Sequence, residues 1–166
     1  ACAVGKIAIN LHDIDMASIS SHKIFGPKNI GMFYHSERIK IYPLLFGNGN
    51  DELSPVTYSL PDVVAFEKAL TIAMNDLDKK EHFISRLNDK ISNELSKYEN
   101  IVLNKTKYLI LHIISVSLKN VDVNMIDKLL SSEEIYIKAM HNEINPSIMA
   151  IYNDVERSKE TLRISL

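Results

Sequence analysis

The sequence predicts a mixed α/β fold, in which short strands come first, a long helical stretch follows, and strands and helices then alternate. Residues 1–45 contain short β-prone runs separated by turn residues. Apolar residues recur at helical spacing from Pro61 to Tyr98, and apolar runs of strand length alternate with helical segments after residue 100. With 166 residues, of which 46% are hydrophobic, the chain can bury a real core.

The segment before residue 50 is predicted to contain three short strands and a loop. The strands are Ile7–Ile9, Met16–Ser20 and Ile30–Tyr34. Gly26 and Pro27 break the chain between the second and third strands. Residues 39–46 are predicted to be extended, and they end at a Gly-Asn-Gly-Asn-Asp loop that begins at Gly47.

The helical stretch can begin at Ser59 or at Pro61, since Ser is a good N-cap and Pro is favoured in a first turn. Its apolar positions share one face. They are Phe66, Leu70, Ala73 and Leu77, continued by Ile84, Leu87, Ile91 and Leu95. The charged residues 76–81 indicate an exposed turn or a kink. We therefore expect two domains, with residues 1–77 in the first and residues 78–166 in the second.

The second domain is predicted to be a small α/β unit. Its strands are expected at Ile101–Leu103, Leu109–Leu118, Ile135–Ile137 and Leu162–Leu166. Its helices are expected at Asn124–Ser131, with Asn124 as the cap, and at Pro146–Tyr152.

Composition excludes several classes of function. A net charge of -2 with a pI of about 6.3 gives no electrostatic reason to expect nucleic acid or an acidic membrane surface. A single cysteine, Cys2, excludes a disulfide framework, and the histidines show no metal-ligand spacing. Because the chain has only one cysteine, reduced, cytoplasmic surroundings are expected. No apolar run is of membrane length. The first residue is not Met, which leads us to expect a piece of a longer protein.

The most informative motif is the segment 20–28, which reads Ser-Ser-His-Lys-Ile-Phe-Gly-Pro-Lys. It places Lys23 after a β-prone run and then turns the chain away. An amine that forms an imine must be partly deprotonated, so Lys23 would need burial or positive neighbours. The alternative interpretation is a surface lysine. The motif resembles that of class V aminotransferases, and most closely that of cysteine desulfurases, which read Ser-x-His-Lys-x-x-Gly-Pro-Lys-Gly-x-Gly.

The resemblance implies the carboxy-terminal part of a fold type I enzyme that uses pyridoxal 5'-phosphate. Residues 1–77 would finish the large domain, and residues 78–166 would form most of the small domain. Lys23 would form an imine with the cofactor and move the proton at the substrate α-carbon. Ser20 and His22 would contact the cofactor phosphate; a hydroxyl that caps its own backbone and a half-buried polar residue are the alternatives. Family members are homodimers.

Two further site residues follow from the resemblance. Ser59 stands where the family has a hydroxyl that reaches the partner subunit's cofactor phosphate. Nearby, Val56 replaces an arginine, and Asn48 and Asn50 replace glycines, so a plain polar turn is the alternative. Arg163 stands where the family has an arginine for the substrate α-carboxylate, a role that suits a planar guanidinium. The alternative for Arg163 is an ion pair on an edge strand.

The thiol of the family is missing. Cysteine desulfurases carry a nucleophilic cysteine on the loop before a Pro-Ser helix start, which is here Pro146-Ser147. The loop 138–144 reads Lys-Ala-Met-His-Asn-Glu-Ile and contains no cysteine. Counting back places Ala139 at the nucleophile position. His141 and Glu143 could do acid-base work, but a solvated loop is the simpler interpretation. Cys2 takes the place of a cofactor-binding glutamine, and we expect it to be a small buried residue.

The leading hypothesis is a cysteine desulfurase-like protein. The parent reaction would remove sulfur from L-cysteine, give alanine, and pass a persulfide to a sulfur-acceptor protein in iron–sulfur cluster or thiolated-RNA pathways. Two alternatives stay open. One is another class V aminotransferase or lyase, which needs no loop thiol, and the other is a degenerate subunit that serves as a scaffold. Without the rest of the family fold, the chain is expected to bind the cofactor poorly.

Overall fold

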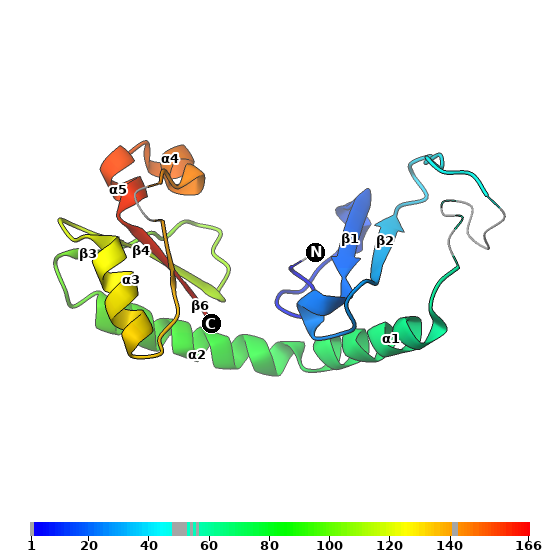
Figure 1. Cartoon of the computed structure of the whole chain (residues 1–166), viewed down its shortest axis with the longest axis horizontal. Coiled ribbons are helices and arrows are strands. Elements are labelled where there is room, and N and C mark those ends of the chain that lie inside the picture. Colours follow the sequence, from blue (N-terminus) through cyan, green and yellow to red (C-terminus); the bar gives the residue numbers. More distant parts are fainter. Residues whose placement is uncertain (1, 48–52, 54, 56, 141–142) are drawn as a thin grey trace. The chain divides into compact units, whose positions relative to one another are not determined.

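The computed structural model describes all residues except 1, 48–52, 54, 56 and 141–142. The chain divides into two units, Ala1–Lys80 and Glu81–Leu166, which are drawn in Figure 1 and are described separately here. The boundary falls inside helix α2 (Leu77–Leu95).

The first unit is built on a β-hairpin and one helix. Its elements are η1 (Leu11–Asp13), β1 (Met16–Ser20), η2 (Ser21–Ile24), β2 (Gly31–His35) and α1 (Leu60–Asn75). The strands pair antiparallel in a register that runs from Met16↔His35 to Ser20↔Gly31. The predicted strands at 16–20 and 30–34 are therefore confirmed.

The predicted strand Ile7–Ile9 is wrong. The amides of Lys6 and Ile7 both donate to the carbonyl of Ala3, which forms a turn, and the side chain of Asn10 caps η1 directly afterwards. Ile7, Ala8 and Ile9 thus lie between two turns, and the segment between these turns is too short to pair with another strand. Residues 39–46 form no strand, and four of their large apolar side chains are exposed to solvent. Tyr42, Leu44, Leu45 and Phe46 each expose between 68% and 95% of their surface.

Helix α1 supplies two of the five buried residues in the core cluster of the first unit. Ser59 is its N-cap residue and Pro61 lies in its first turn, as predicted. Phe66 and Ala73, two turns apart, face a buried cluster with Val4, Ile19 and Ile24. The core therefore holds η2 and β1 against one face of α1.

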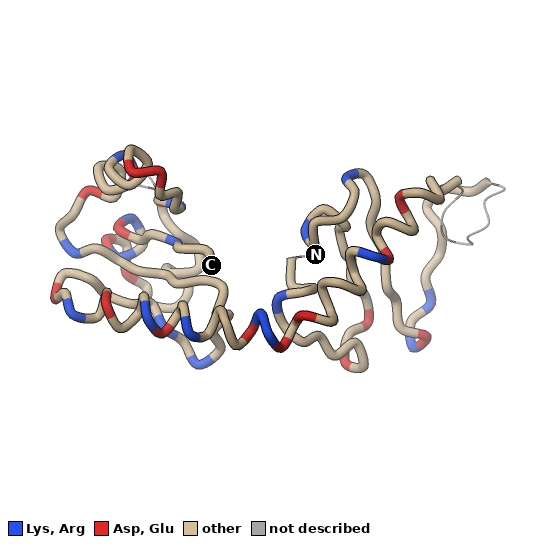
Figure 2. Tube along the Cα trace, turned by 90° about the horizontal axis from the view of Figure 1, so that it is seen from below, with Lys and Arg blue, Asp and Glu red and all other residues tan. Residues whose placement is uncertain are grey.

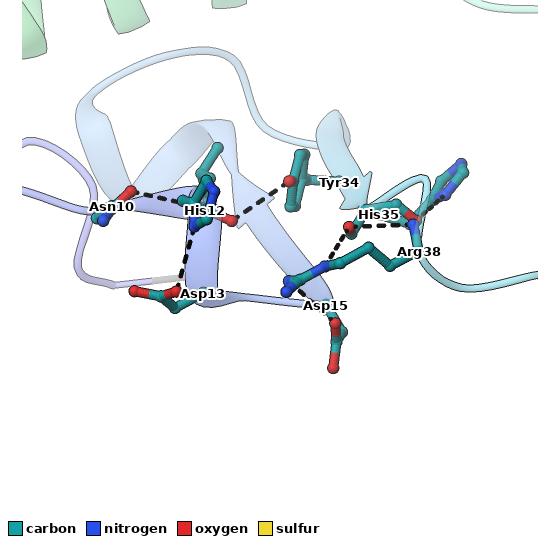
Figure 3. A network of polar contacts seen from close by, with 9 residues as sticks. Asn10, His12, Asp13, Asp15, Tyr34, His35 and Arg38 are labelled. Atoms are coloured by element: carbon teal, nitrogen blue, oxygen red, sulfur yellow. Dashed lines mark hydrogen bonds and ion pairs between the residues drawn. The ribbon is translucent and has the colours of Figure 1, made fainter.

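Polar contacts close the open end of the hairpin (Figure 3). Arg38 donates from its backbone N–H and from Nε to Ser36 Oγ, at 3.3 and 3.0 Å, and its Nη2 lies 3.2 Å from Asp15 Oδ1. The amide of Ser36 donates to the carbonyl of Asp15 at 2.8 Å, and Tyr34 Oη donates to the carbonyl of Leu11 at 3.3 Å. These bonds fix the strand ends opposite to the turn that carries Lys23.

The predicted break in the helical stretch is confirmed. Asp76 ends α1, and α2 begins at Leu77. The charges of both signs along α2 mark a solvated face (Figure 2).

The second unit is a four-stranded antiparallel sheet with helices. The strands are β3 (Ile101–Leu103), β4 (Ile113–Leu118), β5 (Lys138–Ala139) and β6 (Thr161–Ser165), in the order β3-β4-β6-β5. The helices that follow α2 are α3 (Val123–Ser132), α4 (Pro146–Tyr152) and α5 (Val155–Lys159). One face of the sheet carries the core, which contains Val116 of β4, Ala139 of β5 and Leu162 of β6. Ile91 and Leu95 of α2 and Ile126 of α3 cover this core.

Local hydrogen bonds explain where the predictions for this unit fail. Asp122, and not Asn124, caps α3, because its carboxylate accepts the amide of Asn124 at 2.9 Å. Residues 135–137 form no strand, since the amide of Ile135 is used by the carbonyl of Leu130 at the end of α3. Pairing starts only at Lys138. The strand predicted at Leu109–Leu118 begins only at Ile113, so residues 109–112 lie outside β4. The short helix α5 was not predicted.

Candidate functional site

The turn η2 displays His22 and Lys23 because of its three-residue period. In a 3-10 helix, side chains at i and i+3 lie on the same side. Ser21 and Ile24 occupy that side and are buried, at 0% and 6% exposure. His22 and Lys23 therefore fall on the outer side and are exposed.

Backbone bonds to Ser21 close this turn. Its amide donates to the carbonyl of Ile30 at 3.1 Å, and its carbonyl accepts the amide of Gly26 at 3.0 Å. Phe25, which precedes Gly26, adopts a left-handed backbone conformation, with φ 63°. A β-carbon on Gly26 would overlap the Ser21 hydroxyl and would lie 3.1 Å from the β-carbon of Ala69 in α1. The lysine is thus carried by a turn that is fastened to both the hairpin and the helix.

The polar groups on this turn suit the cofactor implied by the motif. Ser20 is half-buried at the end of β1, directly before the exposed pair His22 and Lys23. Across the described residues, none of these three side chains is hydrogen-bonded or ion-paired to another. An amine beside a hydroxyl and an imidazole matches an aldehyde and a phosphate on one ligand. The turn points the side chain of Lys23 outward, so of the two conditions for an imine-forming amine this chain does not supply burial.

Ser59 belongs to the same unit and is exposed. It caps α1 through its backbone only, because its hydroxyl makes no capping bond. That hydroxyl is therefore available to a ligand. Val56, Asn48 and Asn50, whose departures from the family motif bear on this site, lie outside the described residues.

Arg163 lies in the second unit, in the middle of β6. β6 is an interior strand, since β4 and β5 pair with its two sides, so the alternative of an edge strand is wrong. The side chain is exposed and pays no burial cost. Its cross-strand neighbours are Ser115 on β4 and Lys138 on β5.

The residue at the nucleophile position is part of the core. Ala139 is 1% exposed, pairs with Leu162 and packs in the buried cluster of the second unit. Glu143 is exposed, in agreement with a solvated loop, and His141 lies outside the described residues. The expected burial of Cys2 is wrong, because Cys2 is exposed.

In the described part of the chain, no three His, Cys, Asp or Glu side chains gather as metal ligands. Among the same residues, every helix is too short or too polar to cross a bilayer.

Sequence reasoning missed two residues of these surroundings. Ser21 looked like a spacer in the motif, and only the 3-10 geometry shows that it is the buried anchor of the turn. Lys138 was treated as part of a loop, and only the β5–β6 register places it opposite Arg163. The one sequence signal for a strand at Lys138 was its position directly before the apolar pair Ala139-Met140.

Comparison with known proteins gives consistent matches. A family model for aminotransferase class V matches residues 1–166. The mitochondrial cysteine desulfurase of Saccharomyces cerevisiae is 39% identical over 107 residues, which cover 61% of this chain and 22% of that protein. Cysteine desulfurase IscS of Rickettsia typhi is 37% identical over 109 residues, covering 62% and 27%.

Solved structures agree with this result. A structure described as a NifS-like protein matches with a TM-score of 0.82 and 28% identity, over 99% of this chain and 44% of that one. The chain thus spans less than half the length of each protein named here.

Proposed function

Because the chain belongs to the aminotransferase class V family over residues 1–166, we propose that it forms the cofactor-carrying part of a pyridoxal-phosphate enzyme of the cysteine desulfurase type. The overall reaction would convert L-cysteine to alanine and deliver sulfur to an acceptor protein for iron–sulfur cluster assembly. The names of the curated relatives support this reaction. We also propose a homodimer, in which Ser59 serves the cofactor of the other subunit.

One observation carries the proposal: Ser20, His22 and Lys23 lie together on a turn that backbone hydrogen bonds close, and the described residues make no hydrogen bond or ion pair to their side chains. When bound, pyridoxal phosphate draws electrons away from the substrate α-carbon. Lys23 would attach the cofactor through its amine and then hold or move the α-carbon proton. His22 and Ser20 would donate hydrogen bonds to the phosphate.

Arg163 would position the substrate. Its guanidinium can donate two parallel N–H bonds to a carboxylate, which orients an amino acid as well as binding it. Its exposure leaves both donors open to a ligand. This assignment concerns the second unit alone and is tested separately from Lys23.

A second candidate reaction is favoured by the missing thiol. Residues 138–144 contain no cysteine, and Ala139 is buried in β5. A class V aminotransferase or lyase needs no thiol at this position. It would use Lys23 and Arg163 in the same roles, on an amino acid other than cysteine.

The test uses a protein in which this chain completes the whole family fold, incubated with pyridoxal phosphate. We expect a visible absorbance band that borohydride removes, with the reduced cofactor mass on the peptide that contains Lys23. Lys23→Ala should abolish the band, whereas Lys68→Ala, an exposed lysine on α1, should keep it.

Each outcome decides one point. The absence of a band in the unmodified protein would refute cofactor binding. A band with sulfide and alanine formed from L-cysteine supports desulfuration. A band without sulfide release supports the aminotransferase or lyase reaction.

A further inference from the structure

Three hydrogen-bond donors stand side by side across the sheet of the second unit. The register pairs Lys138 of β5 with Arg163 of β6, and Arg163 with Ser115 of β4. Directly paired residues of antiparallel strands project to the same face, with β-carbons roughly 5 Å apart. Lys138 and Arg163 are exposed, and Ser115 is half-buried.

The two cations of this row, Arg163 at its centre and Lys138 at one end, repel each other. Like charges directly opposite on a sheet are destabilising. None of the ion pairs found among the described residues includes either of them. The other same-face positions of these strands are Ile113, Ser117, Thr161 and Ser165, which carry no charge. The sheet therefore does not itself compensate the pair.

Neighbouring groups hold the third donor in place. Asn104 Nδ2 donates to Ser115 Oγ at 3.1 Å, so the serine oxygen is already used as an acceptor and its O–H is left to donate. Arg157 Nε in turn donates to Asn104 Oδ1 at 2.8 Å. The interior strand thus fixes the backbone of Arg163, and this hydrogen-bond chain fixes the side chain of Ser115, before any ligand arrives.

We propose that Lys138, Arg163 and Ser115 form a binding site for a doubly anionic ligand. One carboxylate would accept bonds from Arg163 and Ser115, and a second anionic group would meet Lys138. A monoanion would compensate only one of the two charges, whereas a dianion compensates both and removes their repulsion. Taken as a statement about the substrate, this site rests on the second candidate reaction proposed above, which acts on an amino acid other than cysteine. It selects one with an anionic side chain.

The test measures ligand binding to the full 166-residue chain without cofactor, at low ionic strength. Succinate and butyrate are matched probes. They have the same number of carbons, but succinate carries two negative charges and butyrate carries one. We expect succinate to bind at least about threefold more tightly, as one extra exposed ion pair allows. Lys138→Gln should remove this preference for succinate, and Arg163→Gln should weaken the binding of both ligands. Lys128→Gln on α3 is the matched control and should change neither.

A second readout needs no ligand. Lys138→Gln should raise the midpoint of thermal unfolding, because it removes the repulsion, and added succinate should raise the midpoint of the unmodified chain. Equal binding of succinate and butyrate, no binding of either, or a preference that survives Lys138→Gln would overturn the proposal. Because no cofactor takes part, these outcomes are independent of whether Lys23 carries pyridoxal phosphate.

Discussion

The hydroxyl of Ser21 occupies the space that a β-carbon on Gly26 would need. Ser21 is fully buried, and its Oγ has no hydrogen-bond partner among the described residues. The pair sits beneath the turn that displays His22 and Lys23. The Ser21 side chain thus supports the turn by close packing and not by a hydrogen bond of its own, in addition to the backbone bonds that close the turn.

Gly26→Ala should destabilise the first unit by about 1–3 kcal/mol, because overpacking at a tight contact forces the backbone to move. In a Ser21→Ala background the same substitution should cost clearly less, since the overlapping oxygen is gone. Chemical denaturation of the four proteins of this cycle measures the coupling.

Gly31→Ala is the matched control for that cycle. A β-carbon there would lie 2.6 Å from the carbonyl oxygen of Ile19, which Ser21→Ala does not remove. Its cost should be the same in both backgrounds. Equal rescue of Gly26→Ala and Gly31→Ala would show that Ser21→Ala acts generally and not through this contact.

Asp122→Ala should cost about 1 kcal/mol of stability, because it removes the side-chain cap of α3. Asn124→Ala should cost less, since alanine favours a helix interior and the cap stays in place. Urea unfolding of both variants decides between the two residues. A larger loss for Asn124→Ala would contradict the assigned cap.

Thr161→Val should destabilise the second unit by about 1–3 kcal/mol, because it removes two buried hydrogen bonds. The threonine is 1% exposed, its hydroxyl donates to the carbonyl of Arg157 at 2.6 Å, and its oxygen lies 2.8 Å from Ser117 Oγ. Thr71→Val, at an exposed site on α1, should change stability by less than about 0.5 kcal/mol. Thermal unfolding followed by circular dichroism compares the two, and equal losses would show that burial of the hydroxyl is not the cause.

Lys23→Ala should leave the stability of this chain within about 0.5 kcal/mol of the parent, because the side chain is exposed and makes no described bond. Calorimetry on the chain without cofactor checks this. A large loss would mean that Lys23 supports the turn and is not simply displayed by it.

Periodic and contiguous features were predictable from the sequence. Phe66 and Ala73 lie two helical turns apart, so their shared buried face could be read directly from their spacing. Ser20, His22 and Lys23 lie within one short motif, so their proximity needed no tertiary information. The two strands of the hairpin, though not their pairing, were predictable because Gly26-Pro27 separates two β-prone runs.

Features that depend on competition for backbone hydrogen bonds, on the register of a very short strand or on a 3-10 turn were not predictable from the sequence. The apolar run Ile135–Ile137 has strand composition, but the end of α3 takes the amide of Ile135 first. The pairing of Lys138 with Arg163 depends on a two-residue strand, whose register no sequence pattern specifies. Burial of Ser21 follows from a 3-10 turn, which has no strong sequence signal of its own.

The exposed apolar side chains of Tyr42, Leu44, Leu45 and Phe46 affect the solubility of the purified chain. Contiguous exposed apolar surface promotes aggregation. Purified alone, the chain should scatter light increasingly as its concentration rises. Leu44→Lys with Phe46→Glu would raise its solubility at no cost to a buried contact, which makes that double variant a practical background for the binding experiments.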